Sequence, residues 1–404
     1  MKCDSAHVVA GMAVLAAAAG LVSLAGCSWP FGEKLTATQR LQRNLLEIGR
    51  SDKFVYAWST AGGDWAGTRF DRFHEKTGKH PLMYFAEFRD IGGTWYSPER
   101  YAQHRADFAA VVKREYAARH AIPLVTWHIQ NPYIPPKWEG GNQGMRYRYS
   151  SKGYPQEHRY VLREIVEGTG TLCGTGRIDG VNAKAFPNPR AWFEWCLRDV
   201  AAYCRTLVDE TGERIPIVFR LFHECDGDWF WWGPGSATPE DIIAAHRLAV
   251  DILREELGRE NVLFCYGPDR TWTDAGEVGK SGFLCRYPGD AWMDMLGYDD
   301  YSLGKKDVEK TTAEAIRKMR IISEEGERRG KICGIFECGA KDSCDSFYTV
   351  LHQAMTAPGV HFAILTTYDG PWTFPATEAG LADMKRVLSL PDVYTGENNP
   401  DLVK

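Results

Sequence analysis

Residues 220–233, RLFHECDGDWFWWG, place a carboxyl group beside a row of large aromatic rings. An apolar run, Ile217–Phe219, leads into Arg220, and Glu224 follows at the expected end of a buried strand. Indole rings stack on the apolar faces of sugars, and a carboxyl group can transfer a proton or act as a nucleophile. The segment therefore predicts a sugar-binding site. The alternative is a tryptophan-rich core, but the four consecutive rings at 229–232 cannot all face one core.

A second acidic residue, Glu337, follows another apolar run in the segment GIFECGAK. Most acidic residues are exposed, so the shared position at apolar strand ends singles out Glu224 and Glu337. Cleavage of a glycosidic bond with retention needs two carboxyl groups about 5–5.5 Å apart, against about 6.5–9.5 Å for inversion. Arg220 lies four residues before Glu224, on the same face of a strand, and we expect its charge to keep the nucleophile ionised. Asp299 is expected to support this pair by holding an arginine or backbone groups.

Short apolar strands alternate with amphipathic helices along most of the chain. Buried strands separated by helices are typical of a parallel sheet covered by helices, and eight such units predict an α/β fold, a single (β/α)8 TIM barrel. The alternative, an open doubly wound sheet, lacks its Gly-rich phosphate loop. The expected strands are Phe54–Ala57, Leu82–Phe85, Pro123–Trp127, Ile217–Phe222, Val262–Tyr266, Met295–Tyr298, Ile332–Phe336 and Val360–Thr366. The expected helices are Thr38–Ile48, Glu99–Arg119, Gln156–Glu167, Ala191–Thr211, Pro239–Leu257, Thr311–Arg329 and Ser346–Ala357.

A TIM barrel carries its chemistry on the loops at the carboxyl ends of its strands. Polar and aromatic residues follow five of the expected strands, and the barrel would gather them at one mouth: His128, His223-Glu224, Asp299–Tyr301, Glu337 and Tyr368–Trp372. A long insert, Asn131–Arg190, follows the third strand and is rich in Gly, Pro, Tyr and Arg. It is predicted to be mostly loop, either as a wall of the mouth or as an exposed decoration.

The segments RLFHECDGDWFWWG and GIFECGAK resemble the two signature motifs of glycoside hydrolase family 26, and the resemblance extends from residue 50 to residue 390. The family has a TIM barrel and a retaining mechanism, and most of its members are β-1,4-mannanases. The resemblance implies that Glu224 is the acid/base and Glu337 the nucleophile. It also implies substrate-binding positions for His128, His223, Trp229, Tyr301 and Trp372, with the tyrosine hydrogen-bonded to the nucleophile.

The expected activity is that of a retaining endo-β-1,4-mannanase whose partners are β-mannan and its oligosaccharides. The same fold and mechanism could instead serve β-1,3-xylan or mixed-linkage β-glucan, or release mannobiose from chain ends. A glycan-binding lipoprotein without activity is the alternative outside enzymes, but a binding protein needs no acid/base pair. The mechanism requires no cofactor, and the Cys and His residues lack the spacing of zinc sites, so no metal is expected.

The composition argues against two classes of partner. The chain has 404 residues and a net charge of −5, without a long block of one sign, so neither nucleic-acid binding nor attachment to a membrane surface is expected. We expect a monomer.

The first 26 residues are predicted to be a lipoprotein signal peptide. Val8–Leu24 is apolar and rich in alanine, and Leu24–Cys27 resembles the lipobox of bacterial lipoproteins; a retained membrane anchor is the alternative. Cys27 is then the lipidated residue, 27–50 a tether and an N-terminal helix, and 51–404 the catalytic domain. This predicts an exported lipoprotein of the bacterial envelope, at the outer membrane or facing the periplasm, that meets the membrane only through its lipid.

The chain has 11 cysteines. Setting aside Cys3 and Cys27 leaves an odd number, so at least one thiol is expected to be free even if export allows disulfides. The pairs Cys333–Cys338 and Cys338–Cys344 stay open at this point, as does a pair of Cys173 with either Cys196 or Cys204.

Overall fold

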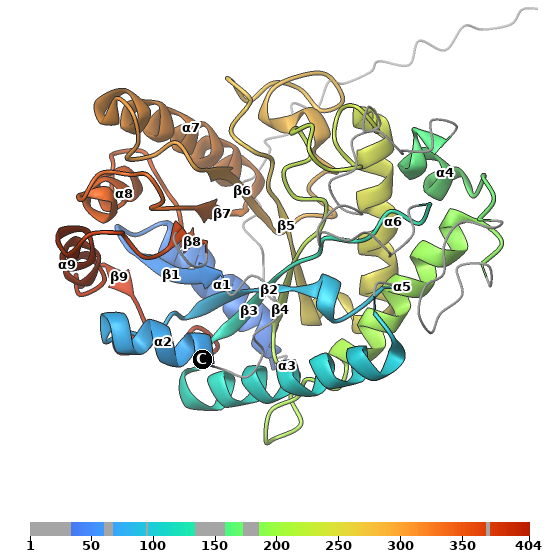
Figure 1. The fold of residues 1–404 in the computed structure, drawn as a ribbon, viewed down its shortest axis with the longest axis horizontal. Coiled ribbons are helices and arrows are strands. Elements are labelled where there is room, and N and C mark those ends of the chain that lie inside the picture. The colour runs from blue at the N-terminus through green and yellow to red at the C-terminus, as the bar shows by residue number, and fades with distance from the viewer. Residues whose placement is uncertain (1–33, 60–67, 94–95, 134–157, 173–185, 369–371) are drawn as a thin grey trace, which may run out of the picture. The chain divides into compact units, whose positions relative to one another are not determined.

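Eight parallel strands close into a barrel in the computed structural model of the protein (Figure 1). The structure describes residues 34–59, 68–93, 96–133, 158–172, 186–368 and 372–404. The strands follow one another in chain order from β2 to β8, and β1 pairs with both β8 and β2 to close the ring. A short strand, β9, extends the sheet beside β1. This confirms the predicted TIM barrel.

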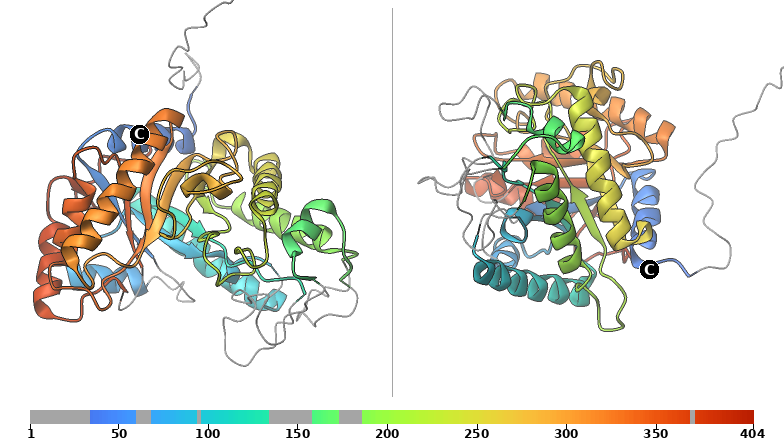
Figure 2. Two further views of the ribbon diagram at one scale, coloured as in Figure 1. Left: turned by 90° about the horizontal axis from the view of Figure 1, so that it is seen from above. Right: turned by 90° about the vertical axis from the view of Figure 1, so that its right-hand side faces the viewer.

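The strands are β1 (Phe54–Ser59), β2 (Met83–Glu87), β3 (Ile122–Thr126), β4 (Ile217–Arg220), β5 (Val262–Tyr266), β6 (Met295–Asp300), β7 (Ile332–Cys338), β8 (Ile364–Thr367) and β9 (Val393–Tyr394). The α-helices are α1 (Ala37–Gly49), α2 (Thr68–Thr77), α3 (Pro98–Arg119), α4 (Val161–Glu167), α5 (Pro189–Cys204), α6 (Pro239–Leu257), α7 (Val308–Arg329), α8 (Phe347–Met355) and α9 (Glu378–Val387). Figure 2 shows the larger helices on the outside of the barrel. Strands covered in this way are buried on both faces, which explains their nearly continuous apolar runs.

Local signals in the sequence fix several helix starts. Thr238 caps α6: its side chain accepts a hydrogen bond from the backbone N–H of Asp241, whose side chain accepts one from the N–H of Thr238. Pro239 follows at the first helical position, where a missing N–H costs nothing. Asn188 and Pro189 begin α5 in a similar way. These caps satisfy N–H groups that would otherwise lack partners.

Several predicted boundaries were wrong. β4 ends at Arg220, two residues early, because the chain turns into the left-handed region at Phe222. Strand β8 begins at Ile364, later than predicted, after a turn at Gly359. Helix α5 ends at Cys204, and the segment that follows forms an antiparallel bridge between Val208 and Arg214. The sequence analysis did not anticipate α2, α9 or β9, and only the C-terminal part of the helix expected at Gln156–Glu167 is present within the described residues.

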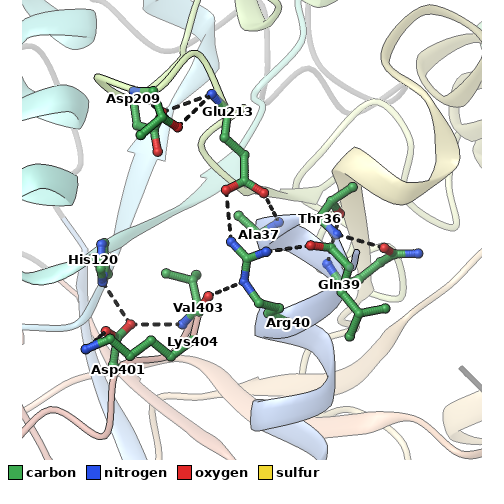
Figure 3. A network of polar contacts seen from close by, with 12 residues as sticks. Thr36, Ala37, Gln39, Arg40, His120, Asp209, Glu213, Asp401, Val403 and Lys404 are labelled. Carbon is green, nitrogen blue, oxygen red and sulfur yellow. Dashed lines mark hydrogen bonds and ion pairs between the residues drawn. The ribbon is translucent and has the colours of Figure 1, made fainter. Parts of the chain in front are cut away.

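Helix α1 covers the N-terminal end of the barrel. Arg40 contacts the carboxylate of Glu213 at 2.9 Å and also donates a hydrogen bond to the carbonyl of Val403 (Figure 3). Glu213 precedes β4, and Glu260, whose carbonyl accepts a bond from Thr36, precedes β5. Glu213 and Glu260 both lie where strands begin, so α1 sits on the face opposite the strand ends that were predicted to carry the chemistry.

The described cysteines form no disulfides. Cys196, Cys204, Cys225, Cys265, Cys285, Cys333, Cys338 and Cys344 are all free thiols. The pairs considered for Cys333, Cys338 and Cys344 are therefore absent, because each of these side chains packs or hydrogen-bonds separately. Cys3, Cys27 and Cys173 lie outside the described residues. Every helix in the described ranges is too short or too polar to span a lipid bilayer.

Candidate active site

The two predicted catalytic carboxyl groups meet at the C-terminal end of the barrel. Carboxylate oxygens of Glu224, Asp299 and Glu337 all lie within 4.8 Å of one another. Glu337 is near the end of β7, and Glu224 follows β4. A separation this short suits direct attack by a carboxylate and leaves no room for the water that an inverting enzyme places between its carboxyl groups.

The chain reaches Glu224 through a strained turn. Phe222 and Glu224 have φ values of 45° and 49°, in a region that non-glycine residues enter at a cost of about 1–3 kcal/mol. The N–H of Glu224 donates to the carbonyl of Gly267, beyond β5, at 2.9 Å. The expectation that Arg220 and Glu224 share a strand face was therefore wrong. Both reach the site, but the turn directs Glu224 there and strand alternation does not.

Arg220 links the carboxylates from inside the barrel. It is fully buried, and its guanidinium donates to Glu337 Oε1 at 2.6 Å and also to Asp299. The hydroxyl of Tyr301 donates to Glu337 Oε2 at 2.8 Å. The carboxylate of Glu337 is thus held at both oxygens by charged or polar donors, which fixes its orientation. The structure thus brings Arg220, Asp299 and Tyr301 together around Glu337, and the roles expected for them stay predictions.

An irregularity between β6 and β7 brings Glu337 to this position. Tyr298 pairs with Ile335, but Asp299 pairs with Glu337, so Phe336 is an extra residue in β7. The guanidinium of Arg220 lies 5.7 Å from the centre of the Phe336 ring and also bonds Glu337. Regular alternation would send consecutive side chains to opposite faces, and the bulge allows both to face Arg220.

Glu224 has surroundings that favour the protonated acid. Burial, followed by the charge of Glu337, raises the pKa of Glu224 to about 7, although Arg220 opposes the shift. The indole N–H of Trp229 donates to Glu224 Oε2 at 2.5 Å. Near neutral pH, Glu224 can therefore donate a proton, and after losing it can accept one from water.

Two histidines pack against each other beside the site. The rings of His128 and His223 meet edge to face, with centroids 4.5 Å apart. His128 hydrogen-bonds to the carboxylate of Glu87 through Nδ1, and its backbone N–H donates to the same group at 3.0 Å. Burial and the neighbouring His128 lower the pKa of His223 well below its usual value, so its ring is neutral. His128 also lines a small pocket with Glu337 and Tyr368.

The tryptophans of 229–232 divide into two groups. Trp229 is partly exposed and contacts Glu224, and its predicted part in sugar binding stays a prediction. Trp231 and Trp232 are fully buried, and their indole N–H groups donate to the carbonyls of Ile129 and His223, both at 2.9 Å. They are structural and hold the turn that carries Glu224.

Trp372 borders the site beside Tyr301. Their ring centroids are 5.0 Å apart, and the planes are nearly perpendicular. The ammonium groups of Lys305 and Lys341 lie 4.8 and 5.0 Å from the centre of the Trp372 ring. Trp372 is thus near the predicted subsite, next to two cations that sequence analysis did not include.

Glu87 is a further residue of the site and was not among those predicted. Glu87 is the last residue of β2, and its carboxylate accepts a hydrogen bond from the backbone N–H of His128, which follows β3. An acidic residue two positions past an expected apolar strand was the available signal. Lys305 and Lys341 had no such signal, because nothing in their local sequence places them beside Trp372.

Part of the chain matches a known protein family. Residues 192–350 match the model of glycosyl hydrolase family 26. The match covers less than half of the chain. The matched segment runs from α5 to α8 and contains Glu224 and Glu337 together with Arg220, Trp229 and Tyr301. His128 and Trp372 lie outside it.

Named relatives resemble parts of the chain. A mannan endo-1,4-beta-mannosidase of Bifidobacterium adolescentis is 33% identical over 142 residues, which cover 35% of this chain and 14% of that protein. One from Thermothelomyces thermophilus is 25% identical over 265 residues, covering 65% of this chain and 44% of that protein. The chain therefore spans less than half the length of these relatives.

Solved structures share the fold over nearly the whole chain. The GH26C structure from a Muricauda species superposes with a TM-score of 0.71 at 23% identity and covers 91% of this chain and 93% of that one. An endo-beta-1,4-mannanase of Cellulomonas fimi gives a TM-score of 0.68 at 24% identity, covering 92% of this chain and 78% of that one. These likenesses support the barrel fold seen here.

Proposed function

We propose that the protein is a retaining endo-β-1,4-mannanase. The observation that carries this proposal is the contrast between two carboxyl groups whose oxygens lie within 4.8 Å. Glu337 is bound by Arg220 and Tyr301, while burial raises the pKa of Glu224 to about 7. One group is thus arranged as a nucleophile and the other as an acid.

The reaction proceeds in two displacements at the anomeric carbon. In the first, Glu337 attacks that carbon while Glu224 gives its proton to the departing glycosidic oxygen, which leaves a covalent glycosyl-enzyme. In the second, Glu224 takes a proton from water as the water displaces Glu337. The net anomeric configuration is retained. Trp229 and the pair His128–His223 flank the reacting centre as sugar contacts.

The relatives support β-mannan as the substrate, because several that match this chain are named mannan endo-1,4-beta-mannosidases. A second candidate has its own observation. Endoglucanase H of Acetivibrio thermocellus is 36% identical over 93 residues, which keeps a β-glucan substrate as the alternative. No comparable observation favours β-1,3-xylan as the substrate, and none favours the release of mannobiose from chain ends.

Hydrolysis of a polysaccharide panel tests the proposal. Reducing sugar should appear from β-mannan, in products of mixed length, and proton NMR should show the β-anomer first. The Glu337→Gln variant, with nearly the same shape, should lose this activity. Faster release from mixed-linkage β-glucan would select the alternative substrate. Binding of these glycans without hydrolysis by the unaltered protein would replace the enzyme with a glycan-binding protein.

We also propose that the protein is a monomeric, exported lipoprotein with its lipid on Cys27. The support is the sequence Leu24–Cys27 behind an apolar stretch. Expression with labelled palmitate in a bacterial host should label the protein in the membrane fraction, and Cys27→Ser should abolish the label. Light scattering of the soluble part, started after Cys27, should give the mass of one chain.

A further inference from the structure

A second group of side chains with metal-binding chemistry lies far from the catalytic carboxylates. His74 is in the last turn of α2, His80 precedes β2, and Glu397 follows β9. The start of β2 is at the N-terminal end of the barrel, and the catalytic residues are at the other end. Nothing in the proposed hydrolysis uses these three residues.

Hydrogen bonds and ring stacking hold these three residues close together. Both oxygens of Glu397 contact residue 80: the side chain Nδ1 at 2.6 Å and the backbone N–H at 3.1 Å. The N–H of Gly396 donates to the carbonyl of His80 at 2.7 Å. The imidazole of His74 is stacked on that of His80, with centroids 4.1 Å apart and planes 15° apart. One potential ligand atom from each of the three side chains lies within 4.8 Å of the other two.

We propose that His74, His80 and Glu397 form a binding site for a divalent transition metal, with zinc as the preferred ion. Two imidazoles and a carboxylate are a ligand set that zinc takes, with water as the fourth ligand. Ligand atoms around a tetrahedral zinc are about 3.4 Å apart, so the 2.6 Å contact between His80 and Glu397 must open slightly to admit an ion. His74 and Glu397 are exposed, so their side chains have room to adjust.

The bound ion would join two parts of the chain that are far apart in sequence. His74 and His80 flank the α2–β2 connection, whereas Glu397 belongs to the C-terminal segment. Because the folded protein offers the three ligands together and the unfolded chain does not, binding stabilises the fold. The site is therefore structural, and its occupancy should leave hydrolysis unchanged.

Thermal unfolding of the full chain with and without zinc tests this site. At a zinc concentration a hundredfold above the dissociation constant, the Tm should rise by roughly 3 °C. His74→Ala is the most informative variant, because it leaves the bond between His80 and Glu397 intact. It should keep the metal-free Tm but lose the zinc response, and calorimetry should show an affinity more than about tenfold lower, since even loss of an outer partner costs 10–100-fold.

His120→Ala provides the matched control. His120 is also paired with a carboxylate, Asp401, at 2.8 Å, so this variant loses a paired histidine and should retain the zinc response. Magnesium and calcium, which prefer oxygen ligands, should give no shift. An equal zinc response in the unaltered protein and His74→Ala, or no response in the unaltered protein, would overturn the proposal. Either result leaves the catalytic proposal untouched.

Discussion

Glu224 and Glu337 have the same side chain but opposite surroundings. Arg220 donates to one oxygen of Glu337 and Tyr301 to the other, whereas Glu224 is half-buried and accepts a hydrogen bond from the indole of Trp229. Burial raises the pKa of Glu224 and the charge of Glu337 raises it further, while Arg220 opposes the shift only in part. The division of roles therefore arises from neighbours that lie on other strands.

The first prediction concerns pH. Because Glu224 must be protonated to assist departure of the leaving group, kcat/KM should fall as pH rises through about 7, the pKa of Glu224 in the folded protein. Initial rates on a soluble mannan between pH 5 and 9 measure this limb. An aryl mannoside with a very good leaving group needs little acid assistance, so its first step should lack the limb. A limb of equal size for both substrates would contradict the assignment.

The second prediction concerns stability and uses the same rise in the pKa of Glu224. Folding raises the pKa of Glu224 above its unfolded value, so its contribution is fully present below the unfolded pKa and is lost as pH rises through about 7. The neutral Glu224→Gln variant avoids that loss. It should match the unaltered protein at pH 5 and exceed its free energy of unfolding by about 1–3 kcal/mol at pH 8. Denaturant unfolding at both pH values decides this, and a constant difference across pH would refute it.

The third prediction concerns the phenol beside the nucleophile. Tyr301→Phe removes the 2.8 Å hydrogen bond to Glu337 and keeps the ring against Trp372. A hydrogen bond to a charged group contributes about 1.5–3 kcal/mol, so kcat should fall about 10–100-fold with little change in Tm. Steady-state kinetics with a parallel melting curve separates these effects. An unchanged kcat would show that Arg220 alone positions Glu337.

At the level of elements, apolar runs were enough to predict the eight strands of the barrel. The same runs did not show where a strand ends, because pairing between strands decides that. Asp299 and Glu337 were expected past their strands, yet they pair with each other inside β6 and β7. The bulge at Phe336 that makes them neighbours depends on register, which the local sequence does not encode.

Site residues were predicted where they lie in a recognisable motif, and they were missed where only the fold brings them to the site. Glu224, Glu337 and Tyr301 carried recognisable motifs. Glu87 and Lys305 did not, since their contacts are with residues of other strands and loops. The direction of Glu224 is set by two left-handed residues, and neither is a glycine that would have announced the turn.

The fourth prediction tests this turn. A Cβ on Gly227 would lie 2.2 Å from the ring of Trp229, so Gly227→Ala must displace the indole from Glu224. Activity should fall about as much as in Trp229→Phe, roughly tenfold for a lost hydrogen bond. In the double variant the two losses should not add, because both remove one contact. Additive losses would place the effect of Gly227 elsewhere.

At the scale of the whole molecule, stability and chemistry occupy opposite ends of the barrel. Helix α1 closes the N-terminal end with buried Leu41 and Leu45 and with the ion pair of Arg40 and Glu213. The strained turn and the clustered charges are at the other end. Changes at one end should therefore leave the other intact.

The fifth prediction measures this separation. Leu41 is fully buried, so Leu41→Ala should cost about 2–5 kcal/mol of the free energy of unfolding. At 25 °C the folded fraction should nevertheless hydrolyse substrate with unchanged kcat and KM. Lys404→Ala, at an exposed position on the same face, should change neither quantity. A lower kcat in Leu41→Ala would show that α1 supports the distant carboxylates.

The docking of α1 also determines how the protein can be immobilised. Lys34 enters the fold at the back of the barrel, beside the strand starts. Attachment to a resin or a surface through that residue would leave the opening directed at the surrounding medium, where long polymer chains can enter. Coupling through Lys305 or Lys341 would instead block the opening, so the choice of lysine decides whether an immobilised preparation works.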